Sequence, residues 1–330
     1  MRWPKFLLLL ILFSFLYWNC EKDFSPLEKD SKTLVRKEMV LFASDRNGGN
    51  MNIWMMEKDG SHPRQVTFYP EGDYFPADIS PDGKTLLFYR WDHYTLVSRI
   101  FVMPTTGPQP DSDQFLISYL CRPGNFFPDG RRFVYDQHTI VSDTNSHDAV
   151  YIFDLQDSSS ILVTPLGSSL EYAAFYSQVS PDGDKISFVQ FYFNQFGLSG
   201  SQLYLMNLDG SNKQALTPGA QGIRANKGRF SRDGRKLFFT MYDPQRGYDP
   251  YFADTNTGQI ILILNSVTSS DNPCPDTSGT KVYFRSGGGA EANQISEIAV
   301  VNIDGSELKK LTNNQYREDM PVVDVIEFYE

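Results

Sequence analysis

A tight turn followed by a short, aromatic-rich strand recurs along this chain and constrains its fold more than any other feature. Ser80-Pro81-Asp82-Gly83 leads into the segment Thr85–Tyr89. Proline fixes its own φ at about −65°, and glycine reaches the positive φ that reverses the chain. Copies of the turn begin at Phe127, Ser180, Ser231 and Asp276, so that successive turns lie 45 to 53 residues apart.

A second turn repeats in step with the first. Asp59-Gly60-Ser61 and Asp209-Gly210-Ser211 lie 150 residues apart, which is three repeats, and Asp304-Gly305-Ser306 follows 95 residues later, after two more. Five repeats between the first and last copies make six units. Each unit holds four short strands: A before the Pro-Asp-Gly turn, B after it, C before the Asp-Gly-Ser turn and D after that. Four strands in a unit of this length predict the blades of a β-propeller.

The two ends of the repeat array complement each other. The first unit begins at a B-type strand, 39–42, and has no A strand before it, whereas 320–323 resembles an A strand with no blade after it. Pairing these segments completes a sixth blade and removes an exposed sheet edge. The sequence therefore predicts an all-β fold: a six-bladed β-propeller of four-stranded antiparallel blades, closed by N- and C-terminal strands in one blade.

The repeat as a whole resembles the WD-like repeats of the TolB-like propeller family. The likeness rests on the Ser-Pro-Asp-Gly-Lys turn, the aromatic strand, Ser44-Asp45-Arg46-Asn47-Gly48, the Ile-Trp strand, Asp-Gly-Ser and Leu-Thr, and it covers about residues 38–328. TolB itself carries an α/β domain before its propeller, where this chain has the polar segment 21–37. The resemblance therefore implies a six-bladed propeller and does not imply the Tol–Pal role.

The N-terminus is typical of an export signal. Arg2 and Lys5 precede an apolar run from Phe6 to Trp18, which is too short to span a bilayer, and Cys20 follows. This pattern resembles a bacterial lipoprotein signal, although Asn19 stands where a small residue is usual. We expect a signal peptide at 1–19, a polar linker at 20–37 with lipidated Cys20, and the propeller at 38–330. Ordinary cleavage and an uncleaved anchor are the alternatives.

The charge of the chain bears on its class of partner, and its cysteine content bears on disulfide pairing. The formal charge is −10, and the sequence has no basic cluster of the kind that nucleic-acid binding requires. We therefore expect no nucleic-acid partner. Besides Cys20, only Cys121 and Cys274 are present. They fall about three blades apart, which predicts two buried, unpaired thiols.

Strand direction predicts where a binding site would lie. Strands alternate in direction within a blade, so the B–C and D–A connections emerge at one end of the propeller and the tight A–B and C–D turns at the other. Function usually resides in variable loops on a rigid scaffold. The predicted B–C loops are 137–148, 191–201, 243–249 and 286–293. The candidate partner-binding residues at this mouth are Asp73, Tyr74, Arg122, Glu171, Tyr172, Arg224, Asn226, Asp271, Asn272, Glu318 and Asp319. The alternative explanation is that these residues are solvated loop charges or pack between blades.

The sequence contains no complete catalytic or metal-binding motif of the common kinds. Gly197-Leu198-Ser199-Gly200-Ser201 lacks the final glycine of a nucleophile elbow, and the four histidines form no metal-ligand motif. We therefore expect no catalytic residue, metal or cofactor. The leading hypothesis is a monomeric, non-enzymatic lipoprotein of the cell envelope, facing the periplasm or the cell surface, that binds a protein or a glycan. The alternative is a lyase- or hydrolase-like enzyme acting on a carbohydrate at the channel mouth, where His93 and His138 would lie on neighbouring blades.

Overall fold

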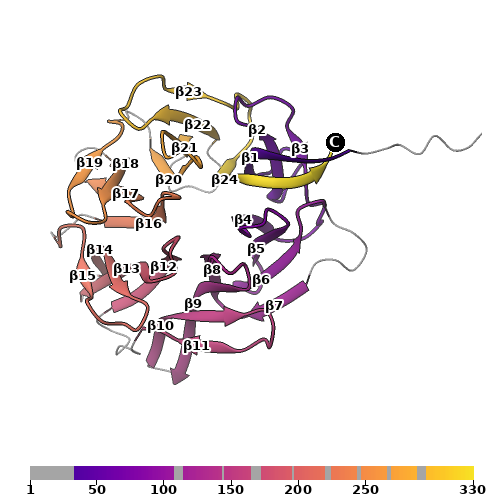
Figure 1. Ribbon diagram of the computed structural model, residues 1–330. Helices are drawn as coiled ribbons and strands as arrows, with labels where there is room; N and C mark the ends of the chain where they lie inside the picture. The colour runs from indigo at the N-terminus through magenta and orange to yellow at the C-terminus, as the bar shows by residue number, and fades with distance from the viewer. Residues whose placement is uncertain are drawn as a thin grey trace, which may run out of the picture. The chain divides into compact units, whose positions relative to one another are not determined.

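The computed structural model describes residues 33–107, 114–142, 145–164, 172–194, 197–219, 224–243, 247–265, 269–287 and 295–330. Residues 36–328 form one compact unit. The described residues contain β-strands and no helix, and their sheets follow one another around a central axis (Figure 1). The predicted all-β propeller is confirmed.

The strands fall into consecutive four-stranded units, which we number as blades 1 to 6 and write from the axis outward. Blades 1 to 3 contain β24 (Glu318–Tyr329), β1 (Leu34–Ser44), β2 (Asn52–Glu57) and β3 (Arg64–Gln65); β4 (Asp73–Ile79), β5 (Thr85–Asp92), β6 (Val97–Pro104) and β7 (Gln114–Ser118); β8 (Cys121–Phe126), β9 (Arg132–Ser142), β10 (Asn145–Asp154) and β11 (Ser160–Leu162). Blades 4 to 6 contain β12 (Tyr172–Val179), β13 (Lys185–Asn194), β14 (Gly197–Asn207) and β15 (Gln214–Ala215); β16 (Arg224–Phe230), β17 (Lys236–Asp243), β18 (Gly247–Asp254) and β19 (Ile260–Leu262); β20 (Ser270–Pro275), β21 (Lys281–Gly287), β22 (Ser296–Asn302) and β23 (Lys309–Lys310).

Hydrogen bonding joins two of these units. Among the described residues the strands form four sheets of four strands and one sheet of eight. The eight-stranded sheet contains blades 4 and 5, which are linked by a single parallel pair, Ser201 with Arg224. Apart from this one pair, each unit has the A–B–C–D order that the sequence predicts.

Blade 1 closes the ring with both ends of the chain. The C-terminal strand β24 lies beside β1, and β1 pairs antiparallel with β2 through Met39–Ser44. In Figure 1 the yellow C-terminal strand accompanies the indigo N-terminal one. This is the predicted closure, in which β24 supplies the innermost strand that the N-terminal strands lack.

The aromatic B strands are buried on both faces because each blade packs between two neighbours. In β9, Phe133 and Tyr135 pack in a cluster with Leu87 of blade 2, whereas Val134 packs with Ile186 of blade 4. Alternate side chains of a strand point to opposite faces, so one strand serves two interfaces. A continuous apolar run is therefore required here, instead of the alternation of a sheet with one wet face.

The Pro-Asp-Gly turns are structural, as predicted. In the first copy, Asp82 Oδ1 accepts hydrogen bonds from Ser80 Oγ at 2.6 Å and from Lys84 N at 3.0 Å. Gly83 has a φ of 79°, and a Cβ on it would lie 2.7 Å from the carbonyl oxygen of Val325. Glycine is thus required both by the turn and by the close approach of β24.

The predicted B–C loops are wrong in extent. Much of 137–148, 191–201 and 243–249 continues the B and C strands into narrow hairpins, in which Asp148 pairs with His138, Ser201 with Phe191, and Asp249 with Met241. Polar and aromatic residues pair across strands as readily as they form loops, so composition concealed these hairpins. Residues 288–293 of the fourth loop lie outside the described residues.

Cys121 and Cys274 are both buried and unpaired, which confirms the prediction. Cys20 and the rest of 1–32 lie outside the described residues. Among the residues that are described, no helix is long and apolar enough to cross a membrane.

Candidate binding sites in the central channel

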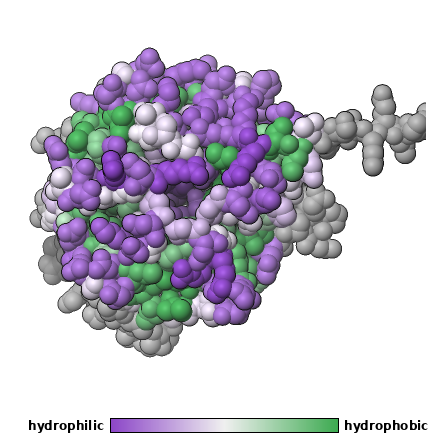
Figure 2. Space-filling view, viewed as in Figure 1, coloured by the Kyte–Doolittle hydropathy of each residue, from purple (hydrophilic) through white to green (hydrophobic). Residues whose placement is uncertain are grey.

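The innermost strand of every blade lines the channel, so the side chains of these strands determine the chemistry of the channel wall. We call the end with the B–C and D–A connections the loop end, and the end with the Pro-Asp-Gly turns the turn end. Figure 2, viewed as in Figure 1, shows hydrophilic residues around the hollowed centre. The mouth of the channel on this face is therefore polar, in contrast to the apolar interfaces between blades.

A β-bulge interrupts the innermost strands of blades 2 to 6 at an equivalent place. The pairing with the B strand shifts after Pro76, Pro123, Phe175, Asn226 and Asp271. A bulge turns the following side chains relative to the strand. In each of these strands the bulge therefore divides the channel-facing residues into a loop-end set before it and a turn-end set after it.

Backbone conformation at the bulge is unusual. Tyr176, Asn272 and Met320, which hold equivalent positions in β12, β20 and β24, all have φ between 51° and 57°. A non-glycine residue adopts this region only where the surrounding structure requires it. The channel wall is therefore fixed by the packing of the blades rather than by local preference.

The loop-end set joins neighbouring blades through charged side chains. Asn272 Nδ2 donates to Asp319 Oδ1 at 2.8 Å, and Arg285 Nη1 lies 3.4 Å from Asp319 Oδ2. Arg122 Nη1 donates to the hydroxyl of Tyr176 at 3.3 Å. Burial, followed by the charge of Asp319, raises the pKa of Asp271.

Lys227 lies at the level of the bulge. Its Nζ is 3.7 Å from Met320 Sδ of blade 1, and the Tyr89 hydroxyl approaches the same sulfur at 3.7 Å from blade 2. Burial, reinforced by the charge of Arg229, lowers the pKa of Lys227 to about 8. The centre of the channel therefore holds a lysine that loses its proton far more easily than one in water.

Arg229 crosses the channel just beyond the bulge. Its Nη2 donates at 2.8 Å to the carbonyl oxygen of Ala77 in blade 2, three blades away, and its Nη1 lies 3.7 Å from Asp78 Oδ1. A guanidinium bound on the opposite wall divides the channel into a loop-end part and a turn-end part.

The turn-end part is a recess of about 300 Å³ to which all six blades contribute. Its polar wall comprises the side chains that follow the bulge, namely Asp78, Asn125, Gln178 and Arg229. Its apolar wall comprises Ile79, Phe126, Phe230, Pro275 and Val323. A concave site that combines apolar walls with a few converging polar groups is the usual form of a small-ligand site.

Contacts between blades fix the polar wall. Asp78 Oδ2 accepts from Phe126 N at 2.9 Å. Asn125 Nδ2 donates to Val179 O at 2.9 Å, and Asn125 Oδ1 accepts from Val179 N at 2.7 Å. Burial raises the pKa of Asp78 to about 7, although the Arg229 guanidinium opposes this.

The candidate residues predicted from sequence separate into two groups. Arg122, Asn226, Asp271, Asn272 and Asp319 lie on the innermost strands near the loop end, where the loop-end contacts described above bring several of them together. They are strand residues and not D–A loop residues as predicted, because the innermost strands begin earlier than composition suggested.

The other predicted residues have different environments. Asp73 is buried and accepts from Met51 N of blade 1 at 2.8 Å, and fully buried Glu318 contacts Arg46 and accepts from Asn314. These two carboxylates join segments of the scaffold. Tyr74 is buried and stacks on Tyr69, and Arg224 lies over Tyr242. Glu171 lies outside the described residues, and Tyr172 is described only as the start of β12.

Both candidate histidines bind an aspartate. His93 Nε2 lies 2.7 Å from Asp73 Oδ2, and His138 Nδ1 lies 2.9 Å from Asp148 Oδ1. The described part of the chain contains no group of three His, Cys, Asp or Glu side chains that could hold a metal ion.

Sequence reasoning missed the turn-end recess. A signal was present: in four consecutive repeats the residue two places before the start of the turn, Asp78, Asn125, Gln178 or Arg229, is polar although it lies in the innermost strand. Such a position is typical of a side chain that faces an internal space.

Apolar side chains are exposed at the loop end of blades 1 and 2. Phe68 is 67% exposed, Tyr94 is 100% exposed, and Leu96 and Tyr119 are 59% and 41% exposed. All four lie in D–A or B–C connections. We call these four residues the loop-end apolar group.

Comparisons with solved structures agree with this architecture. TolB from Acinetobacter baumannii is 17% identical with a TM-score of 0.65, and the match covers 86% of this chain and 66% of that one, just under two thirds of its length. A TolB candidate from Agrobacterium tumefaciens is 18% identical with a TM-score of 0.63, with 89% and 99% covered. Oligogalacturonate lyase in complex with manganese is 15% identical with a TM-score of 0.54, with 82% and 73% covered.

No protein-family model and no curated protein sequence matches the chain. At these identities the structural matches show a shared propeller fold.

Proposed function

We propose that this chain is a non-enzymatic binding protein of the cell envelope, tethered by lipidated Cys20, whose propeller holds a protein partner at the loop end. The loop-end apolar group carries this proposal. A water-facing Tyr94 and a largely exposed Phe68 contribute nothing to the core, whereas aromatic side chains are enriched in interfaces between proteins. A glycan partner, the other possibility, would also stack on aromatic rings.

The charged residues around the loop-end mouth support the same function. Arg122, Asp271 and Asp319 lie beside a channel wall that bulges and blade contacts hold in place. Rigid positioning lowers the entropic cost of binding, since fewer side chains have to be ordered. The mouth would then give orientation and specificity, and the apolar group would give affinity.

The envelope location is proposed from the N-terminal sequence. Acylation at Cys20 would insert several hydrocarbon chains, each CH₂ contributing about 0.8 kcal/mol to membrane binding. Metabolic labelling with an alkyne fatty acid should label the wild-type chain and leave Cys20→Ser unlabelled. Equal labelling of both would contradict the anchor, without bearing on the loop end.

The partner proposal is tested by removing the three aromatic side chains of the loop-end apolar group. Full-length chain carrying Phe68→Ser, Tyr94→Ser and Tyr119→Ser is compared with a control carrying Ile161→Ser, Leu162→Ser and Ile261→Ser, which are exposed on the outermost strands. Crosslinking in native envelopes should yield a defined protein adduct with the wild type and the control, and lose it with the loop-end variant. Equal adducts in all three chains would contradict the proposal, and loss of a glycan adduct instead would identify the other partner class.

A carbohydrate enzyme is the second candidate, because two His–Asp pairs lie on neighbouring blades and the fold is similar to that of oligogalacturonate lyase. Full-length chain incubated with polygalacturonate and Mn²⁺ would then form unsaturated products, detected by ultraviolet absorbance, and His93→Ala would abolish them. The binding proposal expects no product with either chain.

A further inference from the structure

The turn-end recess has a chemistry that the loop-end function does not use. It lies on the other side of Arg229, and none of its lining residues belongs to the loop-end apolar group or to the channel residues predicted from sequence. What it binds can be argued from its walls alone, independently of any partner at the loop end.

The apolar wall gives the recess a side suited to a hydrocarbon group. Ile79, Phe126 and Val323 are almost fully buried, so their packing holds them in place. Prolines at the rim, Pro81, Pro128 and Pro181, belong to consecutive turns and cannot move far from a fixed φ. A ligand that enters therefore meets a preformed apolar surface.

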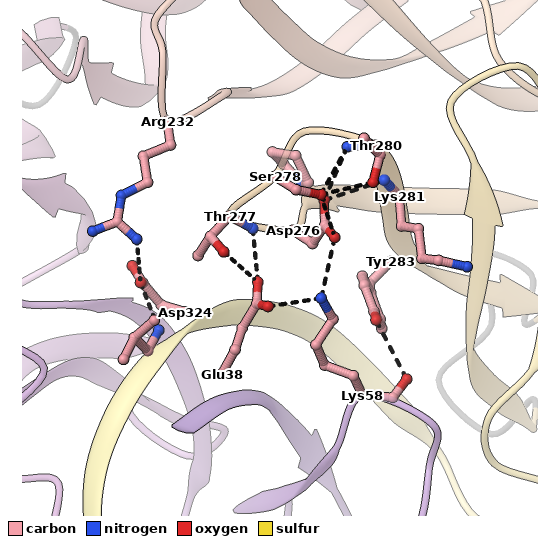
Figure 3. A network of polar contacts seen from close by, with 12 residues as sticks. Glu38, Lys58, Arg232, Asp276, Thr277, Ser278, Thr280, Lys281, Tyr283 and Asp324 are labelled. Carbon is pink, nitrogen blue, oxygen red and sulfur yellow. Dashed lines mark hydrogen bonds and ion pairs between the residues drawn. The ribbon is translucent and has the colours of Figure 1, made fainter. Parts of the chain in front are cut away.

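The polar wall carries opposite charges in two loose pairs. Asp78 and Arg229 are 3.7 Å apart in the interior, and Asp324 and Arg232 are 3.9 Å apart nearer the rim. Figure 3 shows Arg232 of blade 5 extending toward Asp324 of β24. Both separations exceed a direct hydrogen bond, so a ligand group that approaches either pair from the recess does not have to displace a strong contact.

The neighbouring carboxylate of Asp276 provides a reference, because several donors contact it. Asp276 accepts from Lys58 Nζ at 3.1 Å, from Ser278 Oγ at 2.8 Å and from Thr280 N at 3.0 Å. Asp324 Oδ1, by contrast, accepts from the adjacent Val325 N at 2.7 Å and lies 3.9 Å from Arg232. Asp78 and Asp324 are therefore the carboxylates with capacity for a cationic group.

Closure of the ring fixes the rim of the recess. Glu38 of β1 accepts from both N and Oγ1 of Thr277 at 2.8 Å, and Lys58 bridges Glu38 and Asp276 (Figure 3). Asp324 lies on the closing strand itself. A recess that needs all six blades is complete only when blade 1 has closed.

We propose that the turn-end recess binds a small zwitterion of amino-acid or dipeptide size. Its ammonium group lies between Asp78 and Asp324, its carboxylate contacts Arg232, and its apolar side chain packs on Phe126 and Val323. Two charges of opposite sign at fixed separation select against ligands that carry one charge, because the missing group leaves a wall residue without its partner.

Calorimetry with L-leucine, L-phenylalanine and the dipeptide Leu-Leu tests the proposal on the full-length chain in detergent. N-acetyl-leucine lacks the ammonium and leucinamide lacks the carboxylate, and each should bind at least about tenfold more weakly than leucine, since hydrogen bonds to charged groups contribute this much. Wild-type chain that binds none of the three zwitterions at millimolar concentration would overturn the proposal.

Substitutions in the turn-end recess test where the zwitterion binds. Arg232→Gln and Asp324→Asn should each weaken zwitterion binding at least about tenfold, whereas Arg235→Gln, an exposed arginine after the same turn that does not line the recess, should leave it unchanged. Circular dichroism establishes that each variant is folded. Equal affinity in folded Arg232→Gln and Arg235→Gln would place the ligand elsewhere and overturn the proposal.

Discussion

The two ends of the channel are built from the same innermost strands, yet they differ in how their side chains are held. At the turn end, Asp78 and Asn125 bond to the backbone of the next blade, and the recess is walled by turns of one repeated sequence. At the loop end, Arg122 and Asp319 bond to other side chains, and Phe68 and Tyr94 point into water. A repeat that must pack against its neighbours fixes one end of the propeller and leaves the other free to vary.

Arg229 separates these ends, and its removal should have the largest effect. Arg229→Met loses the bond to Ala77 O and leaves Asp78 without its cation. We expect the free energy of unfolding to fall by about 3 kcal/mol in urea denaturation. Arg232→Met, which removes an exposed guanidinium beside Asp324, is the control and should change it by less than about 1 kcal/mol.

The double variant Arg229→Met with Asp78→Asn sharpens this test. Removing the unpaired carboxylate should restore part of the lost stability. Equal stability of the single and double variants would mean that the buried charge does not cause the loss.

Loss of the contacts that close blade 1 at the turn end should have the second-largest effect on the free energy of unfolding. Glu38→Ala removes acceptors for Lys58 and for two donors of Thr277, and we expect a loss of about 2 kcal/mol. Glu307→Ala, whose pair with Lys281 is largely exposed, is the matched control and should change stability by less than about 0.5 kcal/mol. Similar losses in both would show that blade 1 closes without this contact.

Lys227 makes the channel sensitive to pH. Its pKa in the folded protein is about 8, below the ordinary 10.5, so the unfolded chain binds its proton more tightly. Its charged form opposes folding at neutral pH, and stability should rise as the pH increases from about 8 toward 10.5. The charged groups that act on it are Arg229, Asp271 and Asp319.

Lys227→Met should remove that alkaline rise and stabilise the protein at pH 7 by about 1 kcal/mol, since the side chain of Lys227 is only partly buried and solvent screens much of its charge. Thermal melts across this pH range measure both effects. An unchanged pH profile would mean that Lys227 is solvated as in the unfolded chain.

Tyr94→Ser at the loop end should have the smallest effect on folding. The side chain is fully exposed, so the free energy of unfolding should change by less than about 0.5 kcal/mol. A larger loss in chemical denaturation would mean that the loop-end apolar group packs in the scaffold and is not available to a partner.

Much of the fold follows from local signals, while the site does not. Ser80-Pro81-Asp82-Gly83 predicts a turn wherever it occurs, because its hydrogen bonds are made within six residues. Composition predicts a loop between Phe191 and Ser201, where these two residues pair across a hairpin, because cross-strand pairing depends on a partner that composition does not reveal. The sequence predicts Asp73 and Glu318 as binding residues, because a carboxylate buried against another segment cannot be distinguished from a surface charge by sequence alone.

The sequence by itself determined the repeat, the order of four strands in each unit and the pairing of the chain's two ends, since these depend on turn chemistry and on apolar periodicity. Only the tertiary structure decided where Arg229 bonds, which carboxylates are satisfied, and that a recess opens at the turn end. Those outcomes depend on distances between strands some 50 to 150 residues apart, such as Asn125 to Val179 and Ala77 to Arg229. Such distances are set when the blades pack around a common axis, and no local pattern contains them.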